Sequence, residues 1–120
     1  MRSFIATIFI FLLMCTMIFF NNRYVKECSD YILETIDPQK FYTAPALYAE
    51  NLEVFWEENK SFLGLSIASS ELERISDLII ELKAFVNFEN FQEVEHLRLL
   101  ISDSADDLSR LERFEIENLL

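Results

Sequence analysis

The hydrophobic residues of this chain follow two different patterns. From Phe4 to Phe20 they form an unbroken stretch in which only Thr7 and Thr16 are polar. After that stretch, apolar residues recur at steps of three and four positions, and no segment alternates with a period of two. We therefore predict an all-α protein, with an N-terminal transmembrane helix followed by a small antiparallel three- or four-helix bundle.

The apolar stretch is long enough to cross a membrane. As a helix it spans roughly 25 Å, at the short end of the transmembrane range. Helical threonine hydroxyls can donate to their own backbone, so Thr7 and Thr16 are compatible with burial in lipid. We expect residues 1–23 to form a transmembrane signal-anchor helix and residues 24–120 an acidic helical bundle domain.

A cleaved signal peptide is the main alternative, and a buried helix of a soluble protein is a further one. Cleavage requires small residues just after the apolar stretch, whereas positions 18–23 read Ile-Phe-Phe-Asn-Asn-Arg. A lipoprotein modified at Cys15 would need a small residue where Met14 stands. The count of Lys and Arg around the stretch slightly favours a cytoplasmic body, but the very short N-terminus favours export. We expect a single-pass protein of the cell membrane with an extracytoplasmic body.

The membrane helix is expected to continue into the body and to end at Asp37, because the residue before a proline avoids helical geometry. Its inward face is Val25, Cys28, Ile32 and Ile36. Residues 38–44 are expected to form a loop. Pro45 then suits the start of a second helix, and Gly64 suits its C-terminal cap through a positive φ. The apolar face of that helix is Tyr48, Leu52, Phe55, Trp56, Asn59, Phe62 and Leu63.

Two further helices are predicted, each opening with a capping-box pattern. These patterns are Ser70 with Glu73 and Asn90 with Glu93. The buried face of the third helix is Leu72, Ile75, Leu78, Ile79, Leu82, Phe85 and Val86. The fourth helix is the longest of the body, with a seam of Phe91, Val94, Leu97, Ile101, Leu108 and Leu111, beside Leu100 and Ala105. The tail from Phe114 to Leu120 is apolar enough to pack back.

The composition excludes several classes of protein. Hydrophobic residues make up 52% of the 120 residues, yet the net charge is −11. Arg2 is the only charged residue before position 21, so the remaining hundred residues hold nine basic and 21 acidic residues, a net of −12. Such a body is not expected to bind nucleic acid, and it should be repelled by anionic headgroups. One Gly and two Pro exclude a glycine-rich nucleotide loop.

The residues that could carry chemistry do not form a recognisable site. Glu93 and His96 have the spacing of a di-iron motif, but one histidine in the chain cannot complete such a site. The carboxylates of two sets lie three and four residues apart, and we expect both to be solvated helix faces rather than cation sites: Asp103, Asp106 and Asp107, and Glu50, Glu53 and Glu57. Cys15 and Cys28 are too far apart on one helix to form a disulfide. We assign no catalytic, cofactor-binding or metal-binding residue and expect no cofactor.

A groove is the one binding feature that the aromatic residues suggest. Trp56, Tyr48, Phe55 and Phe62 could line it, although aromatic residues at helical spacing more often form core. The sequence is compatible with both interpretations, a groove and core packing.

The order of these features resembles a known family. The leader, the Trp-bearing helix, Ser-Glu-Leu-Glu-Arg-Ile at 70–75 and the closing Phe-Glu-Ile-Glu-Asn-Leu-Leu at 114–120 are similar to Domain of Unknown Function 4363. This is a family of short bacterial proteins found largely in clostridia and related Gram-positive spore-formers, with no established activity. Its pattern often has a histidine just before the Ser-Glu-Leu segment, where this chain has Ser69. The resemblance implies a bacterial, membrane-anchored, extracytoplasmic helical protein.

We therefore expect a membrane-anchored protein that is not an enzyme. Its expected role is a protein-interaction or structural module at the cell surface, with a protein partner or a second copy of itself. The alternative is an extracytoplasmic sensor that binds a small ligand or a cation.

Overall fold

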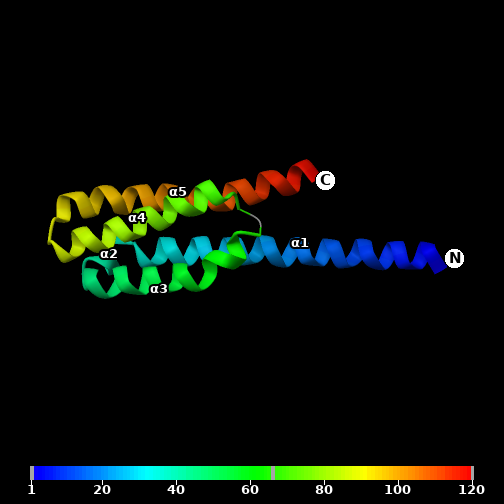
Figure 1. The fold of residues 1–120 in the computed structure, drawn as a ribbon, viewed down its shortest axis with the longest axis horizontal. Coiled ribbons are helices and arrows are strands. Elements are labelled where there is room, and N and C mark those ends of the chain that lie inside the picture. Colours follow the sequence, from blue (N-terminus) through cyan, green and yellow to red (C-terminus); the bar gives the residue numbers. More distant parts are fainter. Residues whose placement is uncertain (1, 66, 120) are drawn as a thin grey trace.

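The chain folds into one long helix and four shorter ones. The computed structural model describes residues 2–65 and 67–119, and the side chains of all of these except 109 and 111–119. The helices are α1 (Arg2–Thr35), α2 (Pro38–Phe41), α3 (Pro45–Leu63), α4 (Ser69–Asn87) and α5 (Phe91–Leu119), as Figure 1 shows. The described residues contain no strand, and the molecule extends over 67 × 24 × 22 Å. The predicted all-α class is confirmed.

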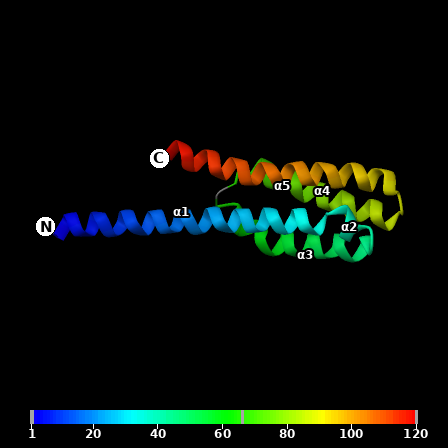
Figure 2. The same cartoon turned by 180° about the vertical axis from the view of Figure 1, so that it is seen from behind.

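Helix α1 belongs both to the apolar leader and to the bundle. Its 34 residues extend over about 51 Å without a break, and the N-terminal half projects beyond all other helices in Figures 1 and 2. This half is long and apolar enough to cross a membrane, and its side chains are exposed. Thr7 and Thr16 donate to the carbonyl oxygens of Ser3 and Leu12 at 2.7 and 2.9 Å, as expected of threonines in an apolar helix.

The second half of α1 and helices α3, α4 and α5 form a four-helix bundle. Around the bundle the order is α1, α3, α4, α5, and α5 also packs against α1, so that neighbouring helices are antiparallel. The bundle has two ends, which we name by their elements. The base is the end where α1 leaves the bundle and the α3–α4 turn lies, and the far end carries α2 and the α4–α5 turn.

The core follows the apolar spacing of the sequence closely. Its buried side chains are Val25, Cys28, Ile32, Ile36, Phe41, Ala49, Leu52, Trp56, Leu63, Ile67, Leu72, Ile75, Ile79, Leu82, Val86, Val94, Leu97, Ile101, Ala105 and Leu108. Two residues that we expected on inward faces are exposed instead. Phe62 lies at the end of α3 and Phe91 at the start of α5, where the neighbouring helices no longer cover them. Leu111 and the tail from Phe114 lie outside the residues whose side chains are described.

Residues 38–44 are not simply a loop, as we had expected. Pro38 opens the short helix α2, and the carboxylate of Asp37 accepts a hydrogen bond from the backbone N–H of Gln39 at 3.3 Å. Proline with its fixed φ, preceded by a capping aspartate, starts a helix as readily as it ends the preceding one. Phe41 at the end of α2 is fully buried and closes the far end of the core.

Several predicted helix caps are wrong in detail. Gly64 has a φ of −63°, so it needs no glycine-specific conformation; a positive φ occurs instead at Glu89. Helix α4 begins at Ser69, which places Ser70 inside the first turn, and its cap residue Ala68 makes no side-chain bond. At α5 the first half of the predicted arrangement forms, because Asn90 accepts from the backbone N–H of Glu93 at 3.5 Å. Helix ends move by a residue easily, which is why cap patterns predict them poorly.

Candidate functional site

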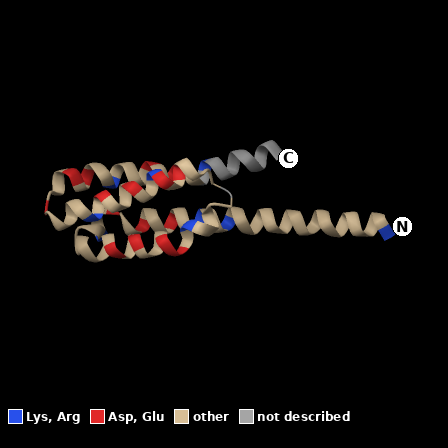
Figure 3. Ribbon diagram, viewed as in Figure 1, with Lys and Arg blue, Asp and Glu red and all other residues tan. Residues whose placement is uncertain are grey.

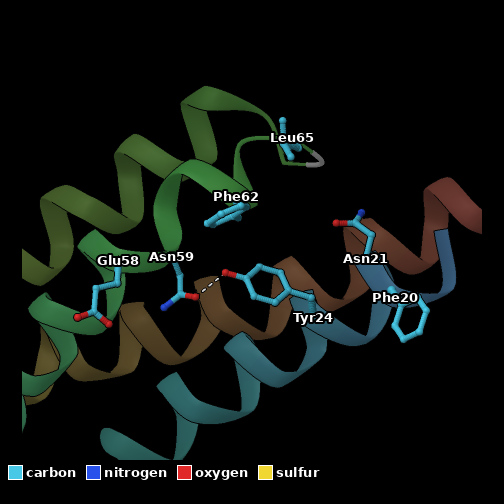
Figure 4. A pocket seen from close by; sticks show the side chains of 7 residues that line it. All are labelled: Phe20, Asn21, Tyr24, Glu58, Asn59, Phe62 and Leu65. Atoms are coloured by element: carbon cyan, nitrogen blue, oxygen red, sulfur yellow. Dashed lines mark hydrogen bonds between the residues drawn. The ribbon is translucent and has the colours of Figure 1, made fainter. Parts of the chain in front are cut away.

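A hollow of the described surface lies at the base. It has a volume of about 410 Å³ and is lined by Phe20, Asn21, Tyr24, Glu58, Asn59, Phe62 and Leu65. Figure 4 shows these side chains between α1 and the end of α3. The hollow is open and mostly apolar, and it begins where the exposed apolar half of α1 ends. We call it the base hollow.

A hydrogen bond between Tyr24 and Asn59 closes the inner wall of the base hollow. The phenol of Tyr24 donates to Oδ1 of Asn59, and the Asn59 amide donates to the carbonyl oxygen of Phe55 at 2.8 Å (Figure 4). Burial, reinforced by the neighbouring Cys28 thiol, raises the pKa of Tyr24 to about 12. The phenol therefore stays protonated and keeps donating at any physiological pH. This bond joins α1 to α3 directly above the apolar segment.

A second polar cluster lies near the far end of the bundle. Arg98 of α5 is nearly buried and donates to both carboxylate oxygens of Glu95, at 3.0 and 2.6 Å. Its remaining nitrogen Nη1 donates to the carbonyl oxygen of Ile36 at 3.3 Å, and Tyr42 donates to Glu95. The bonds from Arg98 and Tyr42 lower the pKa of Glu95 to about 2, and the same carboxylate raises the pKa of Arg98. The cluster satisfies a carbonyl that α1 leaves free at its end.

Two hydroxyl groups join helices inside the core. The indole Nε1 of Trp56 donates to Oγ of Ser76 at 2.6 Å, and that hydroxyl donates to the carbonyl oxygen of Leu72 at 2.9 Å. Ser29 of α1 donates to the carbonyl oxygen of Ala105 of α5 at 2.6 Å. Both hydroxyls are buried, and their hydrogen bonds position the helices that they join.

The aromatic residues that could have lined a groove are not brought together. Trp56 is only 1% exposed and is a core residue. Phe55 stacks on Tyr31 with ring centroids 4.0 Å apart, whereas Phe62 lies in the base hollow. Tyr48 packs against the edge of the core. The core interpretation of Trp56 is confirmed, and Tyr48, Phe55 and Phe62 each line a different surface hollow.

The carboxylate sets do not converge. No group of three or more His, Cys, Asp or Glu residues that could hold a metal ion occurs within residues 2–65 and 67–119. Glu93 and His96 are exposed, as are all three aspartates of the Asp103 set. In the other set, Glu53 pairs with Lys83 at 3.2 Å. Cys15 is exposed on α1 and Cys28 is buried, both as free thiols.

The side-chain hydrogen bonds between helices were not predicted from the sequence. Arg98 and Glu95 were not singled out, and neither were Ser29 and Ser76. The positions of the two serines could have indicated their burial, because each directly follows a predicted core residue. Arg98 directly follows the seam residue Leu97, three residues after Glu95, a spacing at which a helical Glu–Arg pair can form.

No protein-family model, no curated protein and no solved structure matches the chain. The similarity to Domain of Unknown Function 4363 therefore stays a prediction.

Proposed function

We propose that the protein is a membrane-anchored helical module that binds another protein and is not an enzyme. The observation that carries the proposal is the continuity of α1. One helix provides both the exposed apolar segment from Phe4 to Phe20 and one of the four helices of the bundle, so no loop separates the two parts. Such an arrangement presents the bundle at a set height above a bilayer.

The far end of the bundle is the surface that we assign to the partner. Phe88, at the α4–α5 turn, is 81% exposed, and Phe91 on the other side of the turn is 46% exposed. Exposed aromatic side chains are typical anchors of protein interfaces, because each buries a large apolar area. The far end is also the part of the bundle most distant from the apolar half of α1 (Figure 1). A protein approaching the membrane would meet it first.

The resemblance named above supports the remaining parts of the proposal. It favours a bacterial cell membrane and a body outside the cytoplasm.

A photo-crosslinking amino acid at position 88 of the full chain tests this role in native membranes. We expect one or a few discrete cross-linked proteins, which include a second copy of this chain if it self-associates. The matched control places the same amino acid at Glu81, an exposed position on the side of α4. Phe91→Asp in the chain labelled at 88 should abolish the products. A chain that stays monomeric and uncross-linked at position 88 contradicts the proposal.

A further inference from the structure

The last turn of α3 and the α3–α4 turn carry two of the most exposed apolar side chains of the bundle. Phe62 is 64% exposed and Leu65 is 84% exposed. Together with Phe20 of α1 they line the base hollow (Figure 4), and we call these three residues the base surface. This surface continues the exposed apolar face of α1 onto the bundle. Adjoining exposed apolar side chains mark a surface that contacts something other than water.

The base surface lies close to the end of the apolar segment. The rings of Phe62 and Tyr24 meet edge to face, with centroids 6.5 Å apart. Tyr24 is one helical turn beyond Phe20, or about 6 Å along α1. The headgroup region of a bilayer is roughly 5–8 Å thick on each side. If the segment ending at Phe20 fills the hydrocarbon core, Phe62 lies at the level of the headgroups.

Several basic residues lie near Tyr24 and Phe62, at the base of the bundle. Arg23 and Lys26 lie on either side of Tyr24 along α1, and Lys60 follows Asn59 on α3. Figure 3 shows that basic residues gather where α1 leaves the bundle, whereas acidic residues are spread along the bundle helices. Long basic side chains at a bilayer surface lay their stems on apolar groups and reach the phosphates with their charges. Carboxylates are present too, since Glu27 pairs with Arg23 at 3.1 Å and Glu58 lines the hollow.

We propose that the base surface is a second membrane contact, in which Phe62 and Leu65 enter the bilayer interface beside α1. The proposal rests on the membrane anchoring proposed above. The phospholipid bilayer is the occupant to which we commit, because the surface is continuous with the exposed segment from Phe4 to Phe20 and lies among basic side chains. With two points of contact, the bundle is held upright on the membrane instead of tilting about α1.

Tryptophan variants of the full chain in vesicles test the proposal. Leu65→Trp is compared with Phe88→Trp, since these two residues are about equally exposed in turns at opposite ends of α4. The 19 residues of α4 separate the two turns by roughly 28 Å. The vesicles contain phosphatidylcholine and phosphatidylglycerol with acyl chains brominated near the headgroup. We expect quenching at position 65 beyond that of the parent chain, whose buried Trp56 sets the background, and none at position 88.

Two further variants make each outcome decisive. Phe62→Trp repeats the measurement on the neighbouring side chain, so the test stands even if one variant fails to fold. Phe11→Trp, in the middle of the apolar segment, reports on the anchoring alone, in matched vesicles whose acyl chains are brominated near their ends. Quenching at 11 but not at 62 and 65 overturns the second contact and leaves the anchor in place. No quenching at 11 overturns the anchor, and equal quenching at 65 and 88 shows unspecific insertion and also overturns the proposal.

Discussion

Arg98 of α5 donates a hydrogen bond to the backbone carbonyl oxygen of Ile36, at the end of α1, over 3.3 Å. The two residues are 62 positions apart in the chain. Through this bond the last helix of the bundle satisfies the end of the helix that carries the apolar segment. Ser29 and Ala105 join the same two helices nearer the base, at 2.6 Å. The pairing of α1 with α5 therefore couples the apolar segment to the bundle.

Replacing Arg98 should weaken this coupling. Arg98→Ala removes a bidentate ion pair whose arginine is nearly buried and leaves the carbonyl of Ile36 without its donor, which should lower the free energy of unfolding by about 2–3 kcal/mol. The measurement is the denaturation midpoint of the full chain in micelles, followed by far-UV circular dichroism. Arg110→Ala breaks an exposed pair with Asp106 and should cost less than about 1 kcal/mol. Equal effects of the two variants would show that the Glu95–Arg98 pair stabilises the fold no more than an exposed pair does.

Acid should destabilise the fold through Glu95. Arg98 and Tyr42 lower the pKa of this carboxyl to about 2 in the folded chain, below its ordinary value of 4.5. The folded state therefore binds this proton less readily than the unfolded state. The resulting stability is fully present above about pH 5 and is lost as the pH falls toward 2. Glu95→Gln should show a shallower loss of thermal stability between pH 5 and 2.5 than the unchanged chain.

The control for the acid experiment is Glu93→Gln, an exposed position of the same helix. It should follow the unchanged chain over the whole range. If Glu95→Gln and Glu93→Gln give the same pH profile, the carboxyl of Glu95 is not the group that titrates.

The hydroxyl of Ser76 should contribute to the packing of α3 on α4. Ser76→Ala leaves the buried indole N–H of Trp56 without an acceptor, which should cost about 1–3 kcal/mol of unfolding free energy. Because Trp56 is the only tryptophan, its fluorescence follows the unfolding directly. Ser70→Ala, exposed in the first turn of the same helix, should change the midpoint by less than about 0.5 kcal/mol. A loss no larger than that of Ser70→Ala would remove the bond as a stabilising contact.

The two cysteines should resist labelling for different reasons. Burial raises the pKa of the Cys28 thiol, so both its low accessibility and its scarce thiolate slow its reaction. Cys15 is exposed on α1 but lies within the apolar segment, where lipid should cover it. A water-soluble maleimide should leave native membranes unlabelled and add two labels after SDS denaturation. Rapid labelling in native membranes of a Cys15→Ser chain would show that Cys28 is accessible, and that of a Cys28→Ser chain would show that lipid does not cover Cys15.

The helices and their inward faces were predictable because burial repeats with the helical period. The continuation of α1 through Cys28 and Ile32 could be predicted in this way, and so could its end before Pro38 and the start of α3 at Pro45. Each of these depends on neighbours along the chain.

The side-chain hydrogen bonds between helices could not be predicted in the same way. The partners of Ser29 and Arg98 are 76 and 62 residues distant, and their pairing depends on how the helices are ordered around the bundle. The exposure of Phe62 has a similar origin. Periodicity placed it on the inward face, but whether a neighbouring helix reaches that far is a property of the assembled bundle.

Helix α1 should remain part of the mature chain and hold the bundle to a membrane. Alkaline carbonate extraction of native membranes tests it most directly, with the mass of the retained chain read by mass spectrometry. We expect the protein to stay in the membrane pellet and still to carry the apolar segment from Phe4 to Phe20. Release into the supernatant, or a chain that begins after Phe20, would contradict it.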